Sequence, residues 1–306
     1  MPKPKIRPFR TVTRQILPLL LLAAAPCACM VRMEAIQRGK AYLEAKALDY
    51  NQIAAWFDTL TRQHDTFIVK NATLTFSAES DKLLRKERFP SASGVILLDR
   101  NGDLRLQIYA PVIKTTLVDI VSKDGRFSMW YPRNKTLYKG SVDQDLTNVS
   151  VAVSDASKAP RYNLSKLRPM HLTQTFFHSR LSPQSSLAVI QDAIPEERYY
   201  IVFEMMPARS PGEPSRILQA IYMERSSLRI RRKILYDENG QAVCDIRYGN
   251  TEIGGYPDHI SMRRPVEGYE VQLQIRKVQV DTPLTAEMLD LTVPEDAVVK
   301  AIGEKD

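Results

Sequence analysis

The feature that most constrains this chain is an apolar run near its start, ILPLLLLAAAPCAC, over residues 16–29. Five basic residues and no acidic residue lie within residues 1–28. A basic segment followed by about ten apolar residues is typical of a secretory signal peptide. The run is also shorter than the roughly 20 residues that a membrane-spanning helix needs. We therefore predict a signal peptide over residues 1–28, with an uncleaved anchor or a buried helix as the alternatives.

Two cysteines close this run, and each fits a lipid attachment site in part. Bacterial lipoprotein signals end in a leucine, two small residues and the cysteine that receives the lipid. Cys29 follows Ala28 but has Pro26 three residues before it, whereas Cys27 follows Pro26 directly. We predict Cys29 as the lipid attachment residue, with Cys27 or a secreted protein without lipid as the alternatives. Each buried methylene contributes about 0.8 kcal/mol, so two or three chains such as palmitate would fix a protein to one leaflet.

Removal of this signal changes what the charge implies. The chain has a formal net charge of +8, and losing the five basic residues of the signal leaves 8 − 5 = +3. A nucleic-acid partner would need a clustered basic face, which a net charge alone does not indicate, so none is predicted. With Cys29 lipidated, Cys244 is the remaining thiol, which excludes an internal disulfide and a zinc site with two cysteines. Its apolar-polar surroundings predict a buried core thiol.

The rest of the chain divides into a tether and one domain. Residues 29–49 are charged and show no strong period, so we expect a tether there, and we expect residues 50–306 to form a single domain. The domain opens with NQIAAWFDTLTRQ, in which four apolar residues are spaced as on one face of a helix: Ile53, Trp56, Phe57 and Leu60. Asn51 is the candidate N-cap.

Alternating patterns and turn signals then predict strands. From residue 67, Ile68, Ala72, Leu74 and Phe76 alternate with polar residues. Turns are expected at residues 100–103, 124–125 and 238–241, where Asn-Gly or Asp-Gly pairs separate apolar strands.

The last long strand and a second helix complete the expected elements. In YEVQLQIRKVQV, the four residues at 269, 271, 273 and 275 face one way. Residues 163–177 read as a helix, with Pro169 in its first turn. We therefore expect a mainly β fold, in which helices cover one face of a curved antiparallel sheet.

These segments, with their particular residues, resemble the LolA/LolB family of bacterial lipoprotein-localisation factors. The resemblance lies in NQIAAWFDTLTRQ, ATLTFS, SGVILLDRNGDLRLQIYAP, LVDIVSKDGRFSMWYPRNKTLYKG, LRIRRKILYDENGQAVCDIRYGN and YPDHISMRRPVEGYEVQLQIRKVQV, and it covers about 250 residues. The segments NLSKLRP and MERSSLRIRRK are closer to an uncharacterised lipoprotein branch of that family.

The resemblance implies a half-barrel sheet with helices as a lid over an apolar space that takes acyl chains. The family includes a soluble periplasmic carrier and an outer-membrane receptor that is itself a lipoprotein. A lipidated N-terminus matches the receptor type. Met30 follows Cys29 where inner-membrane lipoproteins carry aspartate, which favours the outer membrane, facing the periplasm.

Such a role requires an apolar cavity and no catalytic group. Moving an acyl chain of about 14 methylenes into water costs on the order of 11 kcal/mol, and a dry cavity removes most of that cost. The candidate lining residues are apolar or aromatic and lie in the predicted strands: Leu106, Ile108, Phe127, Met129, Trp130, Tyr131, Phe203, Leu273 and Ile275. The alternative for each is an ordinary core position between sheet and helix.

A basic group in MERSSLRIRRK is the most distinctive polar feature. In a regular strand Arg229, Arg231 and Lys233 share one face. They are candidates for contact with anionic lipid headgroups or with a lipoprotein partner, each charge contributing about 1 kcal/mol near an anionic surface. The alternative is a solvated face paired with neighbouring acids.

Motifs of known catalytic sites do not occur in the sequence. No HExxH, GxSxG, GxxxxGK[ST] or GxGxxG pattern is found, and the four histidines show no tight metal-ligand spacing. We expect a protein without enzymatic activity, cofactor or metal. The leading hypothesis is a lipid-anchored envelope protein that binds acyl chains of lipoproteins or lipids. The alternatives are an envelope sensor or a structural lipoprotein with the same fold.

Overall fold

The computed structural model describes residues 46–80, 85–88, 90–110, 114–142, 169–178, 184–191, 199–208 and 210–301, with the backbone alone at 79–80 and 85–87. These residues belong to one compact unit that spans 45–306. The predicted signal peptide, both N-terminal cysteines and most of the predicted tether lie outside the described residues, as does the first part of the predicted second helix.

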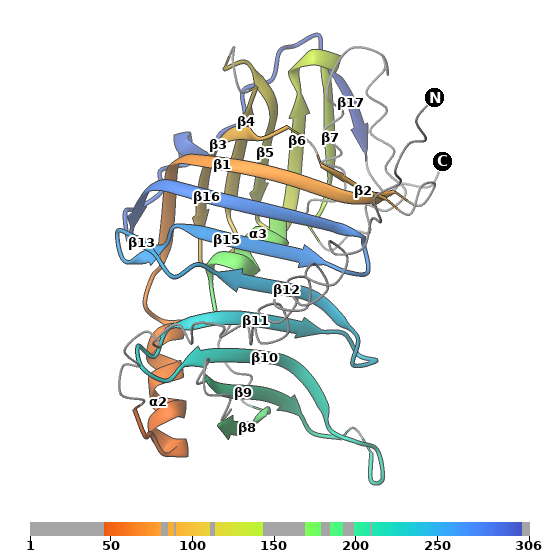
Figure 1. Cartoon of the computed structure of the whole chain (residues 1–306). Coiled ribbons are helices and arrows are strands. Elements are labelled where there is room, and N and C mark those ends of the chain that lie inside the picture. Colours follow the sequence, from red (N-terminus) through yellow and green to blue (C-terminus); the bar gives the residue numbers. More distant parts are fainter. Residues whose placement is uncertain are drawn as a thin grey trace, which may run out of the picture. The chain divides into compact units, whose positions relative to one another are not determined.

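One large sheet dominates this unit (Figure 1). Its strand order is β17-β7-β6-β5-β4-β3-β1-β16-β15-β12-β11-β10-β9-β8, with β2 paired to β1, and the sheet is not closed. The strands are β1 (Thr66–Ser80), β2 (Arg85–Arg88), β3 (Ala92–Asp99), β4 (Leu104–Tyr109), β5 (Thr116–Lys123), β6 (Arg126–Tyr131), β7 (Thr136–Ser141), β8 (Ser186–Gln191), β9 (Tyr199–Met206), β10 (Arg216–Glu224), β11 (Ile230–Tyr236), β12 (Ala242–Tyr248), β15 (His259–Arg264), β16 (Tyr269–Val280) and β17 (Val298–Ala301). A separate hairpin joins β13 (Glu252–Ile253) to β14 (Tyr256–Pro257).

The sheet is mixed, which corrects the expectation of an antiparallel one. β17, from the C-terminal segment, pairs with β7 in parallel, whereas the other described pairs are antiparallel. The expected mainly β character is confirmed, with α2 (Tyr50–Thr61) and α3 (Pro169–Phe176) as the described α-helices. Pro169 is the first residue of α3, as predicted, where its missing N–H leaves no intrahelical bond unmade.

The predicted turns connect the expected strands. Residues 100–103 join β3 to β4, and 124–125 join β5 to β6. Asp124 and Gly125 have φ values of 50° and 72°, the left-handed pair that a two-residue hairpin turn with the twist of its strands requires. Local chemistry alone therefore determined these connections.

Buried and exposed side chains alternate along most strands, and in β16 the buried residues are the predicted ones. Tyr269, Val271, Leu273 and Ile275 are all buried, while the residues between them are partly exposed. In β1 the alternation changes phase, because register shifts between Val69 and Ala72 mark a bulge.

The bulge corrects the predicted pattern of β1. Phe67 and Val69 belong to the core before the bulge, and Ala72 and Leu74 after it. Ile68, which was expected to face with Ala72, lies on the other side of the strand and outside this core cluster.

Helix α2 begins with a capping box, and its N-cap lies two residues earlier than expected. The Asp49 carboxylate accepts from the backbone N–H of Gln52 at 2.8 Å, and the Gln52 side chain accepts from the N–H of Asp49 at 2.9 Å. Asp49, not Asn51, is therefore the N-cap, because only its side chain reaches the free N–H groups of the first turn. Ile53 and Phe57 are the apolar residues that this helix buries.

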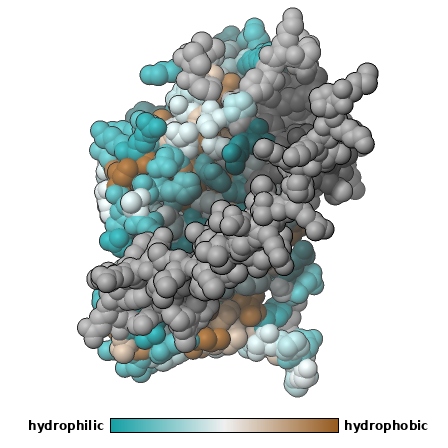
Figure 2. Space-filling model, in the orientation of Figure 1, coloured by the Kyte–Doolittle hydropathy of each residue, from teal (hydrophilic) through white to brown (hydrophobic). Residues whose placement is uncertain are grey.

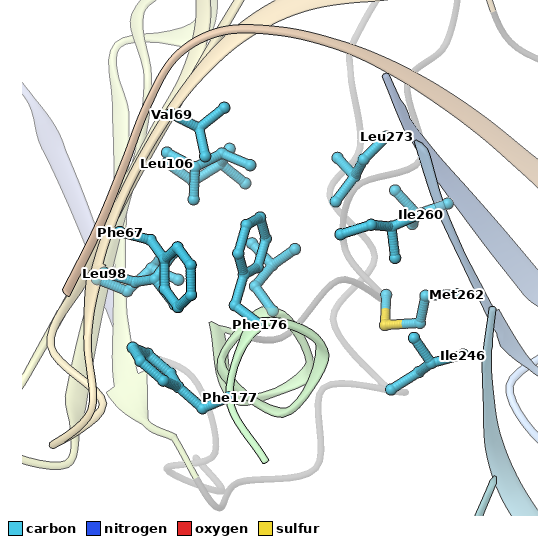
Figure 3. Close-up of a cluster of buried hydrophobic side chains, with 14 of the residues drawn as sticks. Phe67, Val69, Leu98, Leu106, Phe176, Phe177, Ile246, Ile260, Met262 and Leu273 are labelled. Carbon is cyan, nitrogen blue, oxygen red and sulfur yellow. The ribbon is translucent and has the colours of Figure 1, made fainter. Parts of the chain in front are cut away.

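The core lies on the sheet face that both helices cover. Figure 3 shows Phe176 of α3 between Phe67 and Val69 on one side and Ile260 and Met262 on the other. All five side chains are at most 2% exposed, so α3 fills the space between the strands rather than covering it from outside.

The opposite face is covered over β4 to β6 by the C-terminal segment. Arg105 forms an ion pair with buried Asp119 at 2.8 Å and donates to the carbonyl of Met288, in the 3-10 helix Ala286–Leu289. Far along the sheet, the edge strand β8 leaves Ile190 53% exposed. Figure 2 shows hydrophobic surface at this lower end.

Candidate functional site

A pocket of about 430 Å³ lies where α2, the end of α3 and the β13–β14 hairpin meet. Its apolar walls come from Trp56 and Leu60 of α2, Phe67 of β1, and Phe176 and Phe177 at the end of α3. Three segments far apart in the sequence therefore contribute to one hollow, which we call the aromatic pocket.

Four rings form the floor of the aromatic pocket. The ring of Phe67 lies 5.4 Å from Phe176, 5.1 Å from Phe177 and 4.7 Å from Tyr256, measured between centroids. Phe176 and Tyr256 stack, with centroids 5.4 Å apart and planes 3° from parallel. Offset and tilted ring pairs of this kind add about 0.5–1.5 kcal/mol each to the burial of their area. The floor is therefore rigid as well as apolar.

Arg100, from the turn after β3, closes one side of the pocket. Its guanidinium donates to Asp65 at 3.1 Å and to the carbonyls of Thr61 and His64, just after α2. The same group lies over the ring of Phe177, 5.2 Å from the centroid. Arg100 thus links the end of α2 to the aromatic floor.

The rim of the pocket is polar and carries one accessible cation. Arg229 is 49% exposed and forms an ion pair with Glu252 at 3.0 Å. On the other side, the Nδ1 atom of His64 lies 2.9 Å from the carboxylate of Asp281, and this hydrogen bond lowers the pKa of Asp281. A ligand in the pocket would meet rings at its inner end and polar groups at its outer end.

His178 is the unusual polar residue of the lining. Its Nδ1 atom is buried and has no hydrogen-bond partner among the described residues. Burial lowers the pKa of the imidazole well below its ordinary value, and the charges of Lys233 and Arg100 lower it further. The ring is therefore neutral at pH 7, with one nitrogen available to a polar group of a ligand.

The end of α3 is fixed by a lysine from the sheet. Lys233 of β11 is 1% exposed, and its ammonium donates to the carbonyls of Gln174 and of Phe177, the latter at 3.0 Å. These carbonyls belong to the last turn of the helix, which has no intrahelical donors left for them. Burial lowers the pKa of Lys233 to about 8.

Two tyrosines complete this clamp. The hydroxyl of Tyr248 donates to the carbonyl of Thr175 at 2.9 Å, and that of Tyr256 donates to the carbonyl of Phe176 at 3.2 Å. Four successive carbonyls at the end of α3 are thus satisfied by side chains from the sheet and the small hairpin. We call Lys233, Tyr248 and Tyr256 the α3 clamp.

The described residues offer little for metal or thiol chemistry. Among them, no three His, Cys, Asp or Glu side chains gather as a metal site would require. Cys244 is fully buried, as predicted, and burial raises the pKa of its thiol.

Comparison with known proteins concerns the fold. Neither a protein-family model nor a curated protein sequence matches this chain. Among solved structures, it is similar to a LolA superfamily protein from Nitrosomonas europaea, at 17% identity and a TM-score of 0.47, over 80% of this chain and 99% of that one. A DUF1329 family protein from Desulfovibrio piger is similar at 14% identity and a TM-score of 0.46, over 78% and 94%.

A third similar structure is an outer membrane lipoprotein-sorting protein domain from Vibrio parahaemolyticus, at 9% identity and a TM-score of 0.43, over 78% of this chain and 94% of that one. The solved structures found thus include the LolA type that the sequence resembles. At identities this low, the likeness says nothing of what this chain binds. In the part of the chain that the structure describes, no helix is both long and apolar enough to cross a membrane.

The predicted cavity-lining residues lie outside the aromatic pocket. Most of them face α3 within the continuous core and are at most 7% exposed: Leu106, Ile108, Phe127, Met129, Tyr131, Leu273 and Ile275. Trp130 and Phe203 alternate with core residues of β6 and β9, so they lie on the other face of the sheet. None of the nine contributes to the wall of the pocket.

The predicted basic face is divided by a second bulge. A register shift opposite Tyr222 and Met223 leaves Arg231 as an extra residue, so the phase of β11 changes after it. Lys233 consequently faces inward to the α3 clamp, while Arg229 remains at the rim of the pocket. The expectation that these three residues share one face is therefore wrong.

Sequence reasoning missed the pocket because its residues come from separate elements. Trp56 and Leu60 were recognised as part of the apolar helix face, and Phe176 and Phe177 as the end of a helix. The usable signal is that α2 carries more apolar residues than it can bury completely, since Trp56 is only partly buried beside the fully buried Phe57.

Proposed function

We propose that this chain is a lipid-anchored, non-enzymatic protein of the cell envelope that binds acyl chains of lipids or lipoproteins in the aromatic pocket. The observation that carries the proposal is the floor of four packed rings at the inner end of a hollow of about 430 Å³ with a polar rim. The predicted signal peptide and lipid attachment at Cys29 support a location at the outer membrane, facing the periplasm.

The size and lining of the pocket suit one end of an acyl chain. Sites for small ligands are usually hollows of about 300–1,000 Å³ with mainly apolar and aromatic walls and a few polar groups. Each methylene moved from water into such a site contributes about 0.8 kcal/mol, so about six methylenes contribute about 5 kcal/mol. The polar end of the ligand would remain near His178 and Arg229 at the rim.

This proposal moves the acyl site away from the strand residues that the sequence favoured. Leu106, Leu273 and their neighbours are packed against α3, whose end the α3 clamp holds. A chain could reach them only if α3 left the sheet, whereas the aromatic pocket needs no such change.

The two tryptophans of the chain provide a direct test. Trp56 lines the pocket, and Trp130 lies on the other face of the sheet, 7% exposed. The full chain in neutral detergent would be titrated with a brominated fatty acid, whose bromine atoms quench only tryptophans that they contact. Saturable quenching is expected in the Trp130→Phe variant, which reports Trp56, and not in the Trp56→Phe variant. Equal quenching of both, or of neither, would contradict the proposed site.

The anchor is tested separately by labelling with radioactive palmitate. Cys29→Ala is expected to abolish incorporation and release the protein from membranes, and Cys27→Ala serves as the matched control. A Cys29→Ala protein that stays in the membrane fraction would contradict lipid attachment at this residue. Native mass spectrometry of the purified full chain then tells whether a lipid is carried through purification, which a purely structural lipoprotein would not do.

A further inference from the structure

A second hollow, of about 320 Å³, lies over strands β9 to β12 and is lined by basic and aromatic residues. Its described lining consists of three arginines, three tyrosines and one amide: Arg231, Arg232, Arg247, Tyr199, Tyr222, Tyr248 and Asn250. We call it the basic hollow. The sequence marked Arg231 as a candidate for headgroup contact together with Arg229 and Lys233, but it assigned no role to Arg232, Arg247 or the tyrosines beside them.

Strand register places the basic hollow on the sheet face opposite α3. Tyr222 pairs with Arg232, and Arg232 pairs with Arg247, so these side chains form one row across three strands. Their neighbours Ile221 and Ile246 point the other way, into the core. Two guanidinium groups directly opposite each other repel, so this arrangement costs free energy unless an anion lies between them.

The anions present balance only part of this charge. Asp245 accepts from Arg232 at 2.7 and 2.9 Å, and one of its oxygens also lies 3.3 Å from Arg247. Glu224 accepts from Arg231 at 2.6 and 3.2 Å. Three cations therefore share two carboxylates.

Arg247 is the group left most available by this sharing. Its side chain is 64% exposed, and Asp245, with which it forms an ion pair, is already held on both oxygens by Arg232. A guanidinium presents a planar set of N–H donors that matches the oxygens of phosphate, and its charge persists at all relevant pH values.

Two aromatic rings form an apolar wall of the basic hollow, against which the carbon atoms of a ligand could pack. The rings of Tyr199 and Tyr222 meet edge to face, with centroids 6.1 Å apart. Arg232 lies over the Tyr222 ring at 5.4 Å, which holds the guanidinium flat against that wall. A ligand here would find charge-assisted donors for its anionic group and a ring face for its carbon skeleton.

We infer that the basic hollow binds a phosphate-bearing ligand, with Arg247 donating to the phosphate oxygens, Arg231 and Arg232 adding positive charge beside it, and Tyr222 packing against the attached carbon atoms. The phosphate could belong to a phospholipid headgroup or to a soluble phosphate ester. Tyr248 lines both this hollow and the aromatic pocket, so the two sites adjoin one end of β12. Binding in the basic hollow does not require that the aromatic pocket hold an acyl chain.

Calorimetric titration of the full chain in neutral detergent tests this inference. The probes are glycerol phosphate, short-chain phosphatidylglycerol and, as a neutral-headgroup comparison, short-chain phosphatidylcholine. Arg247→Gln removes the exposed donor. Arg62→Gln is the matched control, because Arg62 is 61% exposed and also paired with one carboxylate, that of Asp58. Circular dichroism checks that both variants are folded.

Saturable binding of glycerol phosphate, or of phosphatidylglycerol alone, is expected in the unchanged protein and in Arg62→Gln. The first result identifies a soluble ester as a sufficient ligand, and the second identifies a lipid headgroup. Arg247→Gln should raise the dissociation constant of the phosphate probe at least about tenfold, as expected for loss of one charge-assisted hydrogen bond. The inference is overturned if neither phosphate probe saturates, if phosphatidylcholine binds equally well, or if both variants lose the same affinity.

Discussion

Helices α2 and α3 cover the same face of the sheet, yet they are held there in different ways. The first turn of α2 is closed by its own residues, Asp49 and Gln52. The last turn of α3 is closed by Lys233, Tyr248 and Tyr256, which belong to the sheet and the small hairpin. An eight-residue helix is too short to be stable alone, so α3 depends on these donors and on the packing around it.

This difference assigns different behaviour to the two walls of the aromatic pocket. The wall from α3 is coupled to the whole sheet and should open only with global unfolding. The wall from α2 is held by the helix's own cap at its start and, at its end, by Arg100 from the β3–β4 turn, and it should open at a lower free energy. Trp56 reports on that opening because it lies on α2 and lines the pocket.

The largest effect should come from removing the ring that joins α3 to the sheet. Phe176 is 2% exposed and contacts the rings of Phe67 and Tyr256. Phe176→Ala should lower the free energy of unfolding by about 3–5 kcal/mol, because it removes apolar contacts and leaves a cavity. Urea unfolding measures this as a lower midpoint with an unchanged slope. A loss below about 1 kcal/mol would mean that α3 is not part of the cooperative core.

The next largest effect is a dependence of stability on pH that Lys233 of the α3 clamp should cause. The pKa of Lys233 is lowered to about 8 in the folded protein, against about 10.5 when unfolded. Between these values the unfolded chain binds more protons, so stability rises with pH. Relative to Lys233→Met, the unchanged protein should gain about 2 kcal/mol between pH 7 and 9.5.

Measuring this difference removes the contribution of other titrating groups. Tyr248 and Tyr256 have raised pKa values through burial, which lowers stability once the pH passes the unfolded tyrosine value near 10. Both proteins carry these tyrosines, so they cancel in the comparison. A difference that stays constant from pH 7 to 9.5 would show that Lys233 is not buried as an ammonium.

A smaller effect is expected from one hydroxyl of the clamp. Tyr256→Phe keeps the ring stacked on Phe176 but leaves the Phe176 carbonyl without its donor. The free energy of unfolding should fall by about 1–2 kcal/mol, the usual result of leaving a buried acceptor unpaired. Tyr50→Phe is the control, because the Tyr50 hydroxyl is exposed and makes a longer bond, 3.3 Å, to Leu187. Equal losses in the two variants would argue against a special role for the clamp.

The smallest effect on global stability should come from weakening the N-terminal cap of α2, which should loosen this helix without unfolding the sheet. Asp49→Ala removes the side-chain half of the capping box, which costs about 1 kcal/mol. In a Trp130→Phe background, acrylamide should quench Trp56 more strongly after this change, while the urea midpoint moves little. The comparison would break if the midpoint fell by as much as it does for Phe176→Ala, since α2 would then unfold only with the sheet.

Local signals allowed the sequence to predict the turns, the strand phase of 269–275 and both helices. These features depend on residues within a few positions of one another, such as Asp124 beside Gly125. The phase of β1 was predicted wrongly before the bulge, at Ile68, and that of β11 after residue 230, because a bulge depends on the partner strand and leaves no fixed residue pattern. The pairing of β17 with β7 was missed for the same reason, since it joins segments about 160 residues apart.

The candidate site was less predictable than the fold. Its aromatic character could be anticipated from Trp56 and from the Phe176-Phe177 pair, but their meeting depends on how α3 is held. Lys233 reads as a surface charge in the sequence, and only the phase change at Arg231 turns it toward the carbonyls of α3.

The irregularity in β1 has a consequence for the design of variants. Lys70 and Asn71 are both exposed, although the residues on either side of them are buried. The bulge therefore adds one residue to the alternating pattern of β1. Deleting one of them would restore strict alternation and leave Phe67, Val69, Ala72 and Leu74 on the same face, but it would remove the local bend and extra twist that a bulge gives a strand. A single exposed residue thereby sets how strongly β1 bends between Phe67, at the floor of the aromatic pocket, and the second half of the strand.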